Sequence, residues 1–519
     1  MRTIALSGFM AAGKSTVGPL VAERTGLPFV DTDAELARRA RLSVAEIFRS
    51  EGEVAFRAKE RALVTELLAD GVPRVLALGG GTVTMRDLRH RLLEEGLVVT
   101  LTATPAETLR RAGDLRHRPN LASADPEARA EELLASRTDA YAECHLTLAT
   151  DGVDPESLAD AVASLVRRDP LVVPLGERSY PIDLVDDDPT ALTDAVARIA
   201  PSSVVIVTDA SVHRARFAEL RRALEPLALP GIEVTLTPGE VQKNVASVGA
   251  IWDAALGAGI DRDALVVAFG GGVVGDLAGF AAATLLRGIR VLQVPTSLLA
   301  VLDSSVGGKT GFDHPAGKNL IGAIHQPTSV VADLAHLSSL SHREFISGFG
   351  EAVKVALALD EPLLGELGAF EMKDRAALAS IVRRSVAAKI RIVRDDERER
   401  GQRALLNLGH TIGHALEAQG NYHRFLHGEA VALGLVEELR ASVALGITPK
   451  EIFEEATALL ERLGLPTKID RATLSAAFRW VAGDKKRRGD SLTLPTVTRR
   501  GHATLTHVSM DAFRRALGA

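Results

Sequence analysis

The sequence lacks cysteine pairs, long apolar segments and an excess of basic charge, and each absence excludes a class of protein. Its 519 residues contain one cysteine, Cys144, which rules out a disulfide framework and fits a reducing compartment. No apolar stretch is long and charge-free enough to span a bilayer, and the short apolar run at residues 4–6 leads into a glycine-rich loop, unlike a signal peptide. A net charge of −6 offers no basic field for nucleic acid or anionic membranes. We expect a cytoplasmic protein that acts on small molecules, with no nucleic-acid or membrane partner.

The remaining composition is that of an ordinary globular protein, with 46% hydrophobic and 25% charged residues. A chain of this length predicts three or four domains at about 150 residues each. The clearest boundary lies at Arg167-Arg168-Asp169-Pro170, where a helical pattern runs into charge and proline. We expect domains at 1–168, 171–335 and 336–519.

A phosphate-binding loop is predicted near the N-terminus. Gly8-Phe-Met-Ala-Ala-Gly13-Lys14-Ser15-Thr16 satisfies G-x-x-x-x-G-K-[ST], with an apolar strand before it and a helical pattern after it. In such a loop the backbone N–H groups hold nucleotide phosphates, the lysine reaches the β and γ phosphates, and the serine hydroxyl ligates magnesium. The sequence therefore predicts ATP-dependent chemistry, with Mg²⁺, at Gly8, Ala11, Ala12, Gly13, Lys14, Ser15 and Thr16.

A histidine cluster in the last third of the chain predicts a metal site. His410 and His414 are four residues apart and share a helical face, His427 follows, and Glu351 offers a carboxylate upstream. A His/His/Glu set with an open position is typical of catalytic zinc. The alternative is three satisfied histidines in a helical core, but the flanking glycines favour a site. Spacing alone leaves open whether His410 pairs with His414 or with His427.

Strand and helix patterns alternate in both halves. In the first half, runs at 3–6, 74–78 and 97–101 predict a parallel, doubly wound α/β sheet, whose sites lie at the carboxyl ends of the strands. In the second, strands are predicted at 204–208, 232–236, 264–269 and 289–294, and after about residue 333 helices dominate. We expect an α/β nucleotide-binding domain followed by a helical domain.

At this point residues 1 to about 166 resemble shikimate kinase. The resemblance rests on the phosphate loop, Val30-Asp31-Thr-Asp33, Glu51-Gly-Glu-x-x-Phe-Arg57, Leu78-Gly-Gly-Gly81 and Arg116-His-Arg118-Pro. It implies that Asp31 is a magnesium-side carboxylate, that Asp33 orients or deprotonates the attacking hydroxyl, and that Arg118, or Arg116, neutralises the transferred phosphoryl group. Shikimate would be held by Asp33, Arg57, Gly79, Gly80, Gly81 and Arg137.

From residue 171 to about 509 the chain resembles 3-dehydroquinate synthase. The matching strings include Pro238-Gly-Glu-x-x-Lys243, Gly270-Gly-Gly-Val-Val-Gly-Asp276, Val301-x-Asp303-Ser-Ser-Val-Gly-Gly-Lys309-Thr and Gly317-Lys-Asn319, besides the histidine cluster. The resemblance implies a zinc or cobalt ion on Glu351, His410 and His427. It implies NAD at Glu240, Lys243, Gly272, Val273, Val274, Gly275, Asp276, Thr296, Ser297, Lys309, Lys318, His336, Leu337, Ser338 and Ser339.

By the same resemblance, catalytic residues of this half are Lys309, Lys354, Lys389, Asn407 and His414. Substrate would also contact Arg287, Asp303, Lys318, Asn319, Arg403 and either Lys485 or Lys486. A phosphorylated, carboxylated substrate needs such a cationic set. A homodimer through the cyclase half is expected.

Three rival interpretations remain. Other sugar-phosphate cyclases share the zinc set and NAD loop but use neutral sugar phosphates, whereas Lys389 with Arg403 favours a carboxylate. The glycerol-dehydrogenase type shares the fold but needs fewer lysines. A degenerate N-terminal half that only senses nucleotide is opposed by intact Lys14, Ser15 and Arg57. The sequence therefore predicts a bifunctional shikimate-pathway enzyme.

Overall fold

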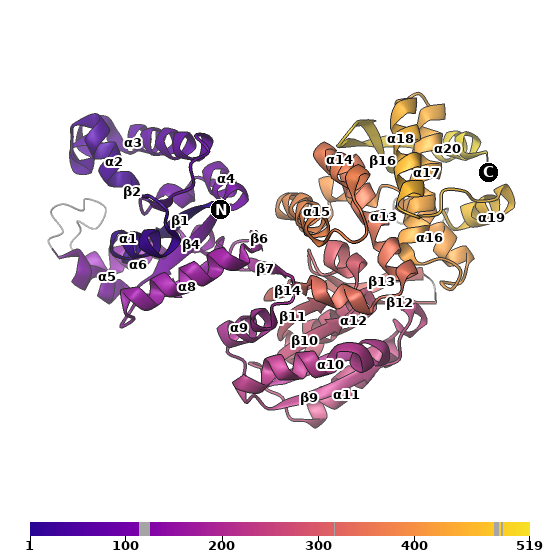
Figure 1. Cartoon of the computed structure of the whole chain (residues 1–519), viewed down its shortest axis with the longest axis horizontal. Helices are drawn as coiled ribbons and strands as arrows, with labels where there is room; N and C mark the ends of the chain where they lie inside the picture. The colour runs from indigo at the N-terminus through magenta and orange to yellow at the C-terminus, as the bar shows by residue number, and fades with distance from the viewer. Residues whose placement is uncertain (114–124, 316, 482–486, 489–490, 519) are drawn as a thin grey trace. The chain divides into compact units, whose positions relative to one another are not determined.

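The computed structural model describes residues 1–113, 125–315, 317–481, 487–488 and 491–518. The chain divides into two compact units, Met1–Asp183 and Leu184–Ala519 (Figure 1). Among the described residues, no helix is both long and apolar enough to cross a membrane.

The first unit is built on a five-stranded sheet of order β2-β3-β1-β4-β5, and all four strand pairs are parallel. This confirms the predicted doubly wound sheet. Its strands are β1 (Thr3–Gly8), β2 (Phe29–Asp31), β3 (Val75–Ala77), β4 (Gly96–Thr102) and β5 (Leu146–Ala149). Its helices are α1 (Lys14–Thr25), α2 (Thr32–Ala40), α3 (Val44–Ala69), α4 (Arg86–Glu95), α5 (Pro105–Ala112), α6 (Pro126–Ala135), α7 (Thr138–Ala142) and α8 (Pro155–Arg168).

Alternate residues of β1 point to opposite faces of this sheet, as the twofold period of a strand requires. Ala5 belongs to an apolar cluster with residues of α3 and α4, whereas Ile4 and Leu6 belong to a cluster with residues of α1 and α8. Both faces are therefore covered, and the polar residues that follow the strands are collected at the carboxyl edge.

A larger sheet has the order β6-β7-β14-β11-β10-β8-β9; its strands β8, β9, β10, β11 and β14 belong to the second unit, whereas the edge strand β6 falls within the residues of the first. The β6–β7 pair is antiparallel, and the pairs among β14, β11, β10, β8 and β9 are parallel. The strands are β6 (Leu171–Val173), β7 (Tyr180–Val185), which spans the division between the units, β8 (Val204–Asp209), β9 (Gly231–Leu236), β10 (Leu265–Gly270), β11 (Arg290–Pro295) and β14 (Ser329–Asp333). The accompanying helices are α9 (Pro189–Ile199), α10 (Ala210–Leu224), α11 (Val245–Gly257) and α12 (Gly272–Thr284), and a hairpin is formed by β12 (Lys309–His314) and β13 (Gly317–Ile324).

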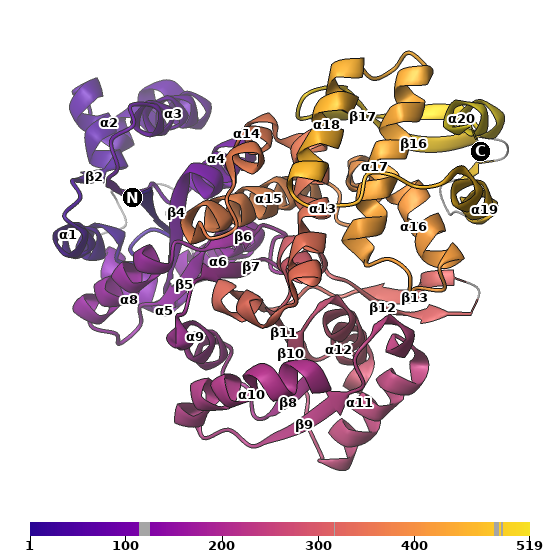
Figure 2. The same ribbon diagram turned by 45° about the vertical axis from the view of Figure 1, so that its right-hand side comes forward.

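After β14 helices dominate, as predicted. They are α13 (His342–Leu359), α14 (Glu361–Ala369), α15 (Arg375–Asp395), α16 (His410–Gln419), α17 (His427–Ala444), α18 (Lys450–Arg462), α19 (Arg471–Val481) and α20 (Met510–Leu517); Figure 2 shows α16 and α17 from a second side. A further sheet that was not predicted lies in this part of the chain: β16 (Ser491–Arg499) pairs with β17 (His502–Ser509) and, at its start, with β15 (Arg487–Arg488).

Candidate functional sites

The loop between β1 and α1 has the backbone that a phosphate site needs. Gly8 and Gly13 have φ of +132° and +99°, and a Cβ on Gly8 would lie 2.1 Å from the carbonyl oxygen of Leu101. The buried Lys14 ammonium donates to the carbonyls of Gly8 and Phe9, both at 2.8 Å. The lysine is thus held over the loop, where a bound phosphate could replace the carbonyls as its partner.

Ser15 and Asp31, the residues predicted to lie beside magnesium, are in direct contact. The Ser15 hydroxyl donates to Asp31 Oδ2 at 2.7 Å. Asp31 also begins α2, because its Oδ1 accepts from the backbone N–H groups of Asp33 and Ala34, both at 3.1 Å. These contacts fix both predicted magnesium-side oxygens at the same sheet edge.

Asp33 and Arg57 meet around a buried glutamate that sequence reasoning missed. Glu60 is fully buried; it accepts from Arg57 NH1 at 2.7 Å, and a Cβ on Gly79 would meet both Glu60 and Asp33. Burial, followed by the charges of Glu60 and Asp31, raises the pKa of Asp33 to about 6. The available signal was Glu60 three residues after Arg57 on one helix face, but such pairs are usually solvated.

Arg137 and Tyr141 both bind the carbonyl oxygen of Gly80. Arg137 NH1 donates at 3.0 Å and the Tyr141 hydroxyl at 2.5 Å. The predicted shikimate residues are positioned by α2 (Asp33), α3 (Arg57), the loop after β3 (Gly79–Gly81) and the start of α7 (Arg137). Arg116 and Arg118 lie outside the described residues.

Glu351, His410 and His427 converge from three helices of the second unit. One ligand atom from each lies within 4.8 Å of the other two. His410 Nε2 and His427 Nε2 lie 3.4 and 3.5 Å from Glu351 Oε1. Both Glu351 oxygens are buried: Oε2 forms an ion pair with the Lys354 ammonium, and Oε1 faces the two imidazoles. One carboxylate and two imidazoles suit zinc, so these residues fit the predicted ion.

Outer contacts aim the two imidazoles at Glu351. The Nδ1 atom of His410 lies 3.1 Å from the carbonyl oxygen of Leu408, and Nδ1 of His427 lies 3.1 Å from Glu417 Oε1. Each ring is thereby oriented with Nε2 toward Glu351, as in metal sites whose histidines are held by outer acceptors. His414, Glu417 and His427 form a second group of the same dimension, so the choice of ligands stays a prediction. Glu417 was not predicted as a site residue.

Glycines let the helices that hold these ligands approach closely. A Cβ on Gly428 would lie 1.7 Å from the carbonyl oxygen of Ser347, and one on Gly434 would lie 1.9 Å from that of Gly409. No larger residue fits at either position without moving a helix backbone. The spacing of α13, α16 and α17 is therefore set by contact between their main chains.

Four of the predicted NAD residues, Glu240, Lys243, Asp276 and Lys318, form buried ion pairs. Lys243 donates to Asp276 Oδ2 at 2.5 Å and to Asn319 Oδ1 at 2.6 Å. Lys318 pairs with Glu240 at 2.8 Å and with Glu417 at 3.0 Å. Through Glu417 this network reaches His427 of the histidine cluster.

The glycine loop that precedes α12 lies close to the other predicted NAD residues. Gly271 begins α12, and a Cβ there would lie 3.5 Å from the Ser297 hydroxyl. The N–H of Thr296 donates to the Gly270 carbonyl at 3.0 Å. These contacts bring Gly272–Asp276, Thr296 and Ser297 to the carboxyl ends of β10 and β11.

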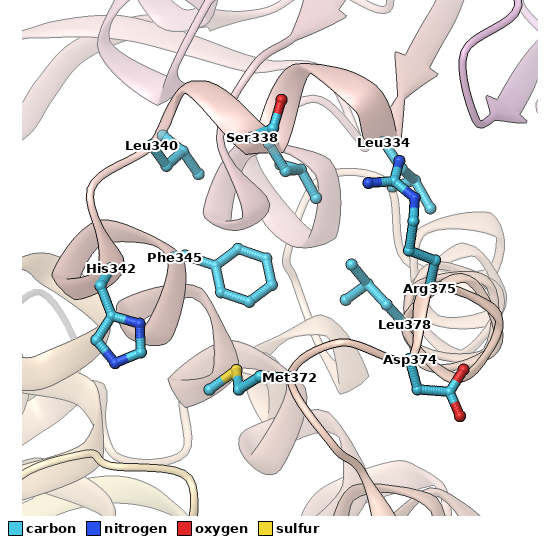
Figure 3. Close-up of a pocket in the computed structure, with 10 residues that line it drawn as sticks. Leu334, Ser338, Leu340, His342, Phe345, Met372, Asp374, Arg375 and Leu378 are labelled. Atoms are coloured by element: carbon cyan, nitrogen blue, oxygen red, sulfur yellow. The ribbon is translucent and has the colours of Figure 1, made fainter.

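Near the last part of the NAD stretch the structure has a cleft of about 340 Å³. Figure 3 shows Leu334, Ser338, Phe345, Leu378 and Arg375 around it. Leu337 and Ser338, both predicted NAD contacts, contribute to its wall, while the His336 ring packs edge-on against Phe269.

Asp303 and the buried Lys389 form the centre of the predicted substrate set. Lys389 donates to Asp303 Oδ1 at 2.6 Å and to its carbonyl at 2.5 Å. Burial lowers the pKa of Lys389 to about 8, although Asp303 opposes the shift. Lys354 forms an ion pair with Glu351. Arg403 is buried too, but its guanidinium donates to the carbonyls of Glu397 and Gly307.

A further glutamate connects two predicted substrate residues. Glu399 Oε2 pairs with Lys309 at 2.5 Å, and its Oε1 accepts from the Asn407 amide at 2.8 Å. Glu399 lies in a charged run, Asp395 to Arg400, whose composition predicts a solvated loop. The sequence around it therefore gave no indication of a site residue.

Arg287 does not join this set. It is exposed at the C-terminal end of α12, and a helix of 13 residues separates it from the loop at Gly272 by about 18 Å. Lys485 and Lys486 lie outside the described residues.

The phosphate loop on the first α/β unit is typical of a kinase. The second unit combines a glycine-rich loop with a His/His/Glu cluster, as sugar-phosphate cyclases do. Residues 10–167 match the shikimate kinase family. Residues 233–347 match the N-terminal part of 3-dehydroquinate synthase, and 348–487 match its C-terminal part. The chain belongs to the 3-dehydroquinate synthase family and carries an N-terminal shikimate kinase domain.

Each half of the chain has similar proteins. The 3-dehydroquinate synthase of Halorhodospira halophila is 46% identical over 344 residues, which cover 64% of this chain and 94% of that protein. The structure of 2-epi-5-epi-valiolone synthase from Streptomyces hygroscopicus with NAD⁺ and Zn²⁺ bound is 26% identical and covers 66% of this chain and 97% of its own, with a TM-score of 0.59. Acinetobacter baumannii shikimate kinase, solved with shikimate, is 35% identical over 33% of this chain and 94% of its own, with a TM-score of 0.32. By its family matches and its curated relatives, this chain has shikimate kinase and 3-dehydroquinate synthase activities of the shikimate pathway.

Proposed function

We propose that the two activities use separate sites with separate cofactors: Mg²⁺ and ATP in the first unit, and NAD with zinc or cobalt in the second. The observation that carries this proposal is that the described residues form two separate sets, one around the phosphate loop and one around Glu351. The relatives with NAD⁺ and a metal ion in their structures support the second set.

In the kinase site, Lys14 neutralises phosphate charge, and Ser15 with Asp31 holds magnesium directly or through water. Arg57 and Arg137 bind the shikimate carboxylate. Asp33 orients and deprotonates the attacking hydroxyl, for which a pKa of about 6 suits a general base near neutral pH. The product is shikimate 3-phosphate.

In the cyclase site, Glu351, His410 and His427 would hold the metal ion, and the loop before α12 would hold NAD. When bound, the metal polarises a substrate hydroxyl and NAD takes up and returns a hydride in each cycle. Lys309, Lys354 and Lys389 bind the anionic groups of the heptulosonate 7-phosphate substrate, and Asn407 orients it. His414, one turn from His410, moves a proton or contacts the phosphate, and the products are 3-dehydroquinate and phosphate.

Arg287 supports a homodimer. It is exposed beyond the C-terminal end of α12, about 18 Å along the helix from the nucleotide loop, where a second copy of the chain could reach it. If Arg287 contacts substrate, it does so in the site of a second copy of this chain.

Chelation and selective reloading test the separation of cofactors. After exhaustive chelation both activities should be lost. Adding Mg²⁺ alone should restore phosphorylation of shikimate, whereas cyclisation should return only with Zn²⁺ or Co²⁺. Recovery of cyclisation with Mg²⁺ alone would contradict the proposed zinc-type site, since two imidazole ligands do not suit Mg²⁺.

A further inference from the structure

The kinase unit extends beyond the part of the chain that matches the shikimate kinase family. The match ends at residue 167, whereas the compact unit continues to Asp183. Val172 is buried in the same apolar cluster as Tyr141 and Cys144, within the core of this unit. Residues 169–179 are therefore part of the kinase fold and not a free linker.

Two groups of hydrogen bonds attach this segment. At its start, the Arg2 guanidinium donates to Asp169 Oδ1 at 2.5 Å and to the Pro170 carbonyl at 2.8 Å. Further along, the N–H of Gly176 donates to Glu143 Oε1 at 3.1 Å, and that of Glu177 donates to Asp139 Oδ1 at 3.1 Å. The acceptors of the second group belong to the five-residue helix α7: Asp139 lies within it, and Glu143 caps its C-terminal end.

The two sides of α7 have different partners. Asp139 and Glu143 face the turn at 175–179, while Arg137 and Tyr141 bind the carbonyl oxygen of Gly80. Residues two positions apart on a helix project about 200° from each other, so the two pairs point in opposite directions. A helix of one turn is not stable by itself and takes its position from its contacts.

The Glu143 side of this contact is rigid. Its Oε2 accepts from Arg89 Nε at 2.6 Å, so the carboxylate is fixed between α4 and the turn. The turn itself fits closely, because Gly176 has φ of +62° and a Cβ there would lie 2.3 Å from Asp139 Oδ1. A side chain at position 176 would therefore displace the Asp139 carboxylate from its contact with the turn.

We propose that residues 169–179 position the shikimate site, because the backbone of their turn holds α7 through Asp139 and Glu143 and α7 in turn places Arg137 and Tyr141 on the Gly80 loop. The inference rests on the proposed role of Arg137 in binding shikimate. It assigns to a segment outside the family match a function in substrate affinity, with Asp139 as a positioning residue.

The test measures steady-state kinetics of both activities in the full-length chain. Gly176→Ala and Asp139→Ala should each raise the KM for shikimate by about tenfold, equivalent to about 1.4 kcal/mol. The kcat and the KM for ATP should be unchanged, because the phosphate loop does not depend on α7. Asp139→Asn keeps an acceptor oxygen and should restore the wild-type KM, which a general loss of stability would not do.

Gly152→Ala is the matched control. Gly152 also has a left-handed backbone, with φ of +69°, but a Cβ there meets nothing within 4 Å, so it carries the backbone strain without the contact. An unchanged KM for shikimate in Asp139→Ala, or an equal rise in Gly152→Ala and Gly176→Ala, would overturn the proposal. Asp139 is exposed, so Asp139→Ala remains informative if Gly176→Ala does not fold.

Arg137→Ala separates this inference from the function on which it rests. A raised KM for shikimate in Arg137→Ala with wild-type kinetics in Asp139→Ala would reject only the positioning role. An unchanged KM in Arg137→Ala would reject the assignment of Arg137 and the inference with it.

Discussion

Replacing Glu417 by glutamine should weaken metal binding in the cyclase site without removing a ligand. Glu417 Oε1 lies 3.1 Å from His427 Nδ1 and 3.0 Å from Lys318 Nζ. Burial opposes ionisation of Glu417, but His427 and Lys318 hold its pKa well below the usual range. It is therefore a carboxylate that orients the imidazole and increases its basicity toward a metal ion.

Glutamine keeps the size and one acceptor oxygen but removes the charge. Loss of an outer partner of this kind costs about 10- to 100-fold in metal affinity, and we expect the lower end for Glu417→Gln and the upper end for Glu417→Ala. That range corresponds to about 1.4–2.7 kcal/mol. Lys318 retains Glu240 as a partner at 2.8 Å, so the NAD side of the network should remain in place.

The measurement is Co²⁺ affinity, by competition with a chelator in the purified chain, read from the absorption of the bound ion. Glu437→Gln is the control: Glu437 is also buried and lies on α17, but it pairs with Arg440 and not with a histidine. Equal affinities in Glu417→Gln and Glu437→Gln would refute the reasoning. If Glu351→Gln binds Co²⁺ normally while Glu417→Ala binds none, then His414, Glu417 and His427 are the ligands.

Two further predictions concern the catalytic groups. The pKa of Asp33 is about 6, so its carboxylate becomes protonated as the pH falls. The kcat/KM for shikimate should therefore drop tenfold per pH unit below about 6 and level off above it. A profile that is flat down to pH about 5 would exclude Asp33 as the base. Arg287→Ala and His410→Ala should each abolish cyclisation. Refolding an equal mixture of the two variants should restore about a quarter of the wild-type rate, because half of the dimers are mixed and each mixed dimer has one intact site of two. If a mixture shown to contain mixed dimers does not recover, Arg287 acts in the site of its own subunit.

Sequence reasoning located the parts of the sites that are encoded in consecutive residues. The phosphate loop, the glycine loop before α12 and the histidine cluster are local motifs whose chemistry depends on spacing within one turn or one helix. Glu399 and Glu417 were missed because they bind partners that only the fold brings near, and Glu60 because nothing local showed that its pair with Arg57 is buried. Glu417 and Lys318, for example, are 99 residues apart in sequence.

The β16–β17 hairpin was missed for a different reason. Residues 491–494 alternate in polarity, as a strand requires, but the alternation ends at Pro495, which argues against an interior strand. Among the described residues, β15 pairs with Ser491 and Leu492, and no described strand pairs with that side of β16 at Pro495. The proline is therefore compatible with a strand whose neighbours the sequence did not reveal.

The close contact of main chains at Gly428 and Gly434 determines how the cyclase unit should respond to losing its ion. In zinc fingers the energy of metal binding is spent on folding, and the apo form is disordered. Here α13, α16 and α17 are held together by contact between their own backbones, so the positions of Glu351, His410 and His427 follow from helix packing. We therefore expect the cyclase unit to stay folded after chelation and to take up an ion again without refolding.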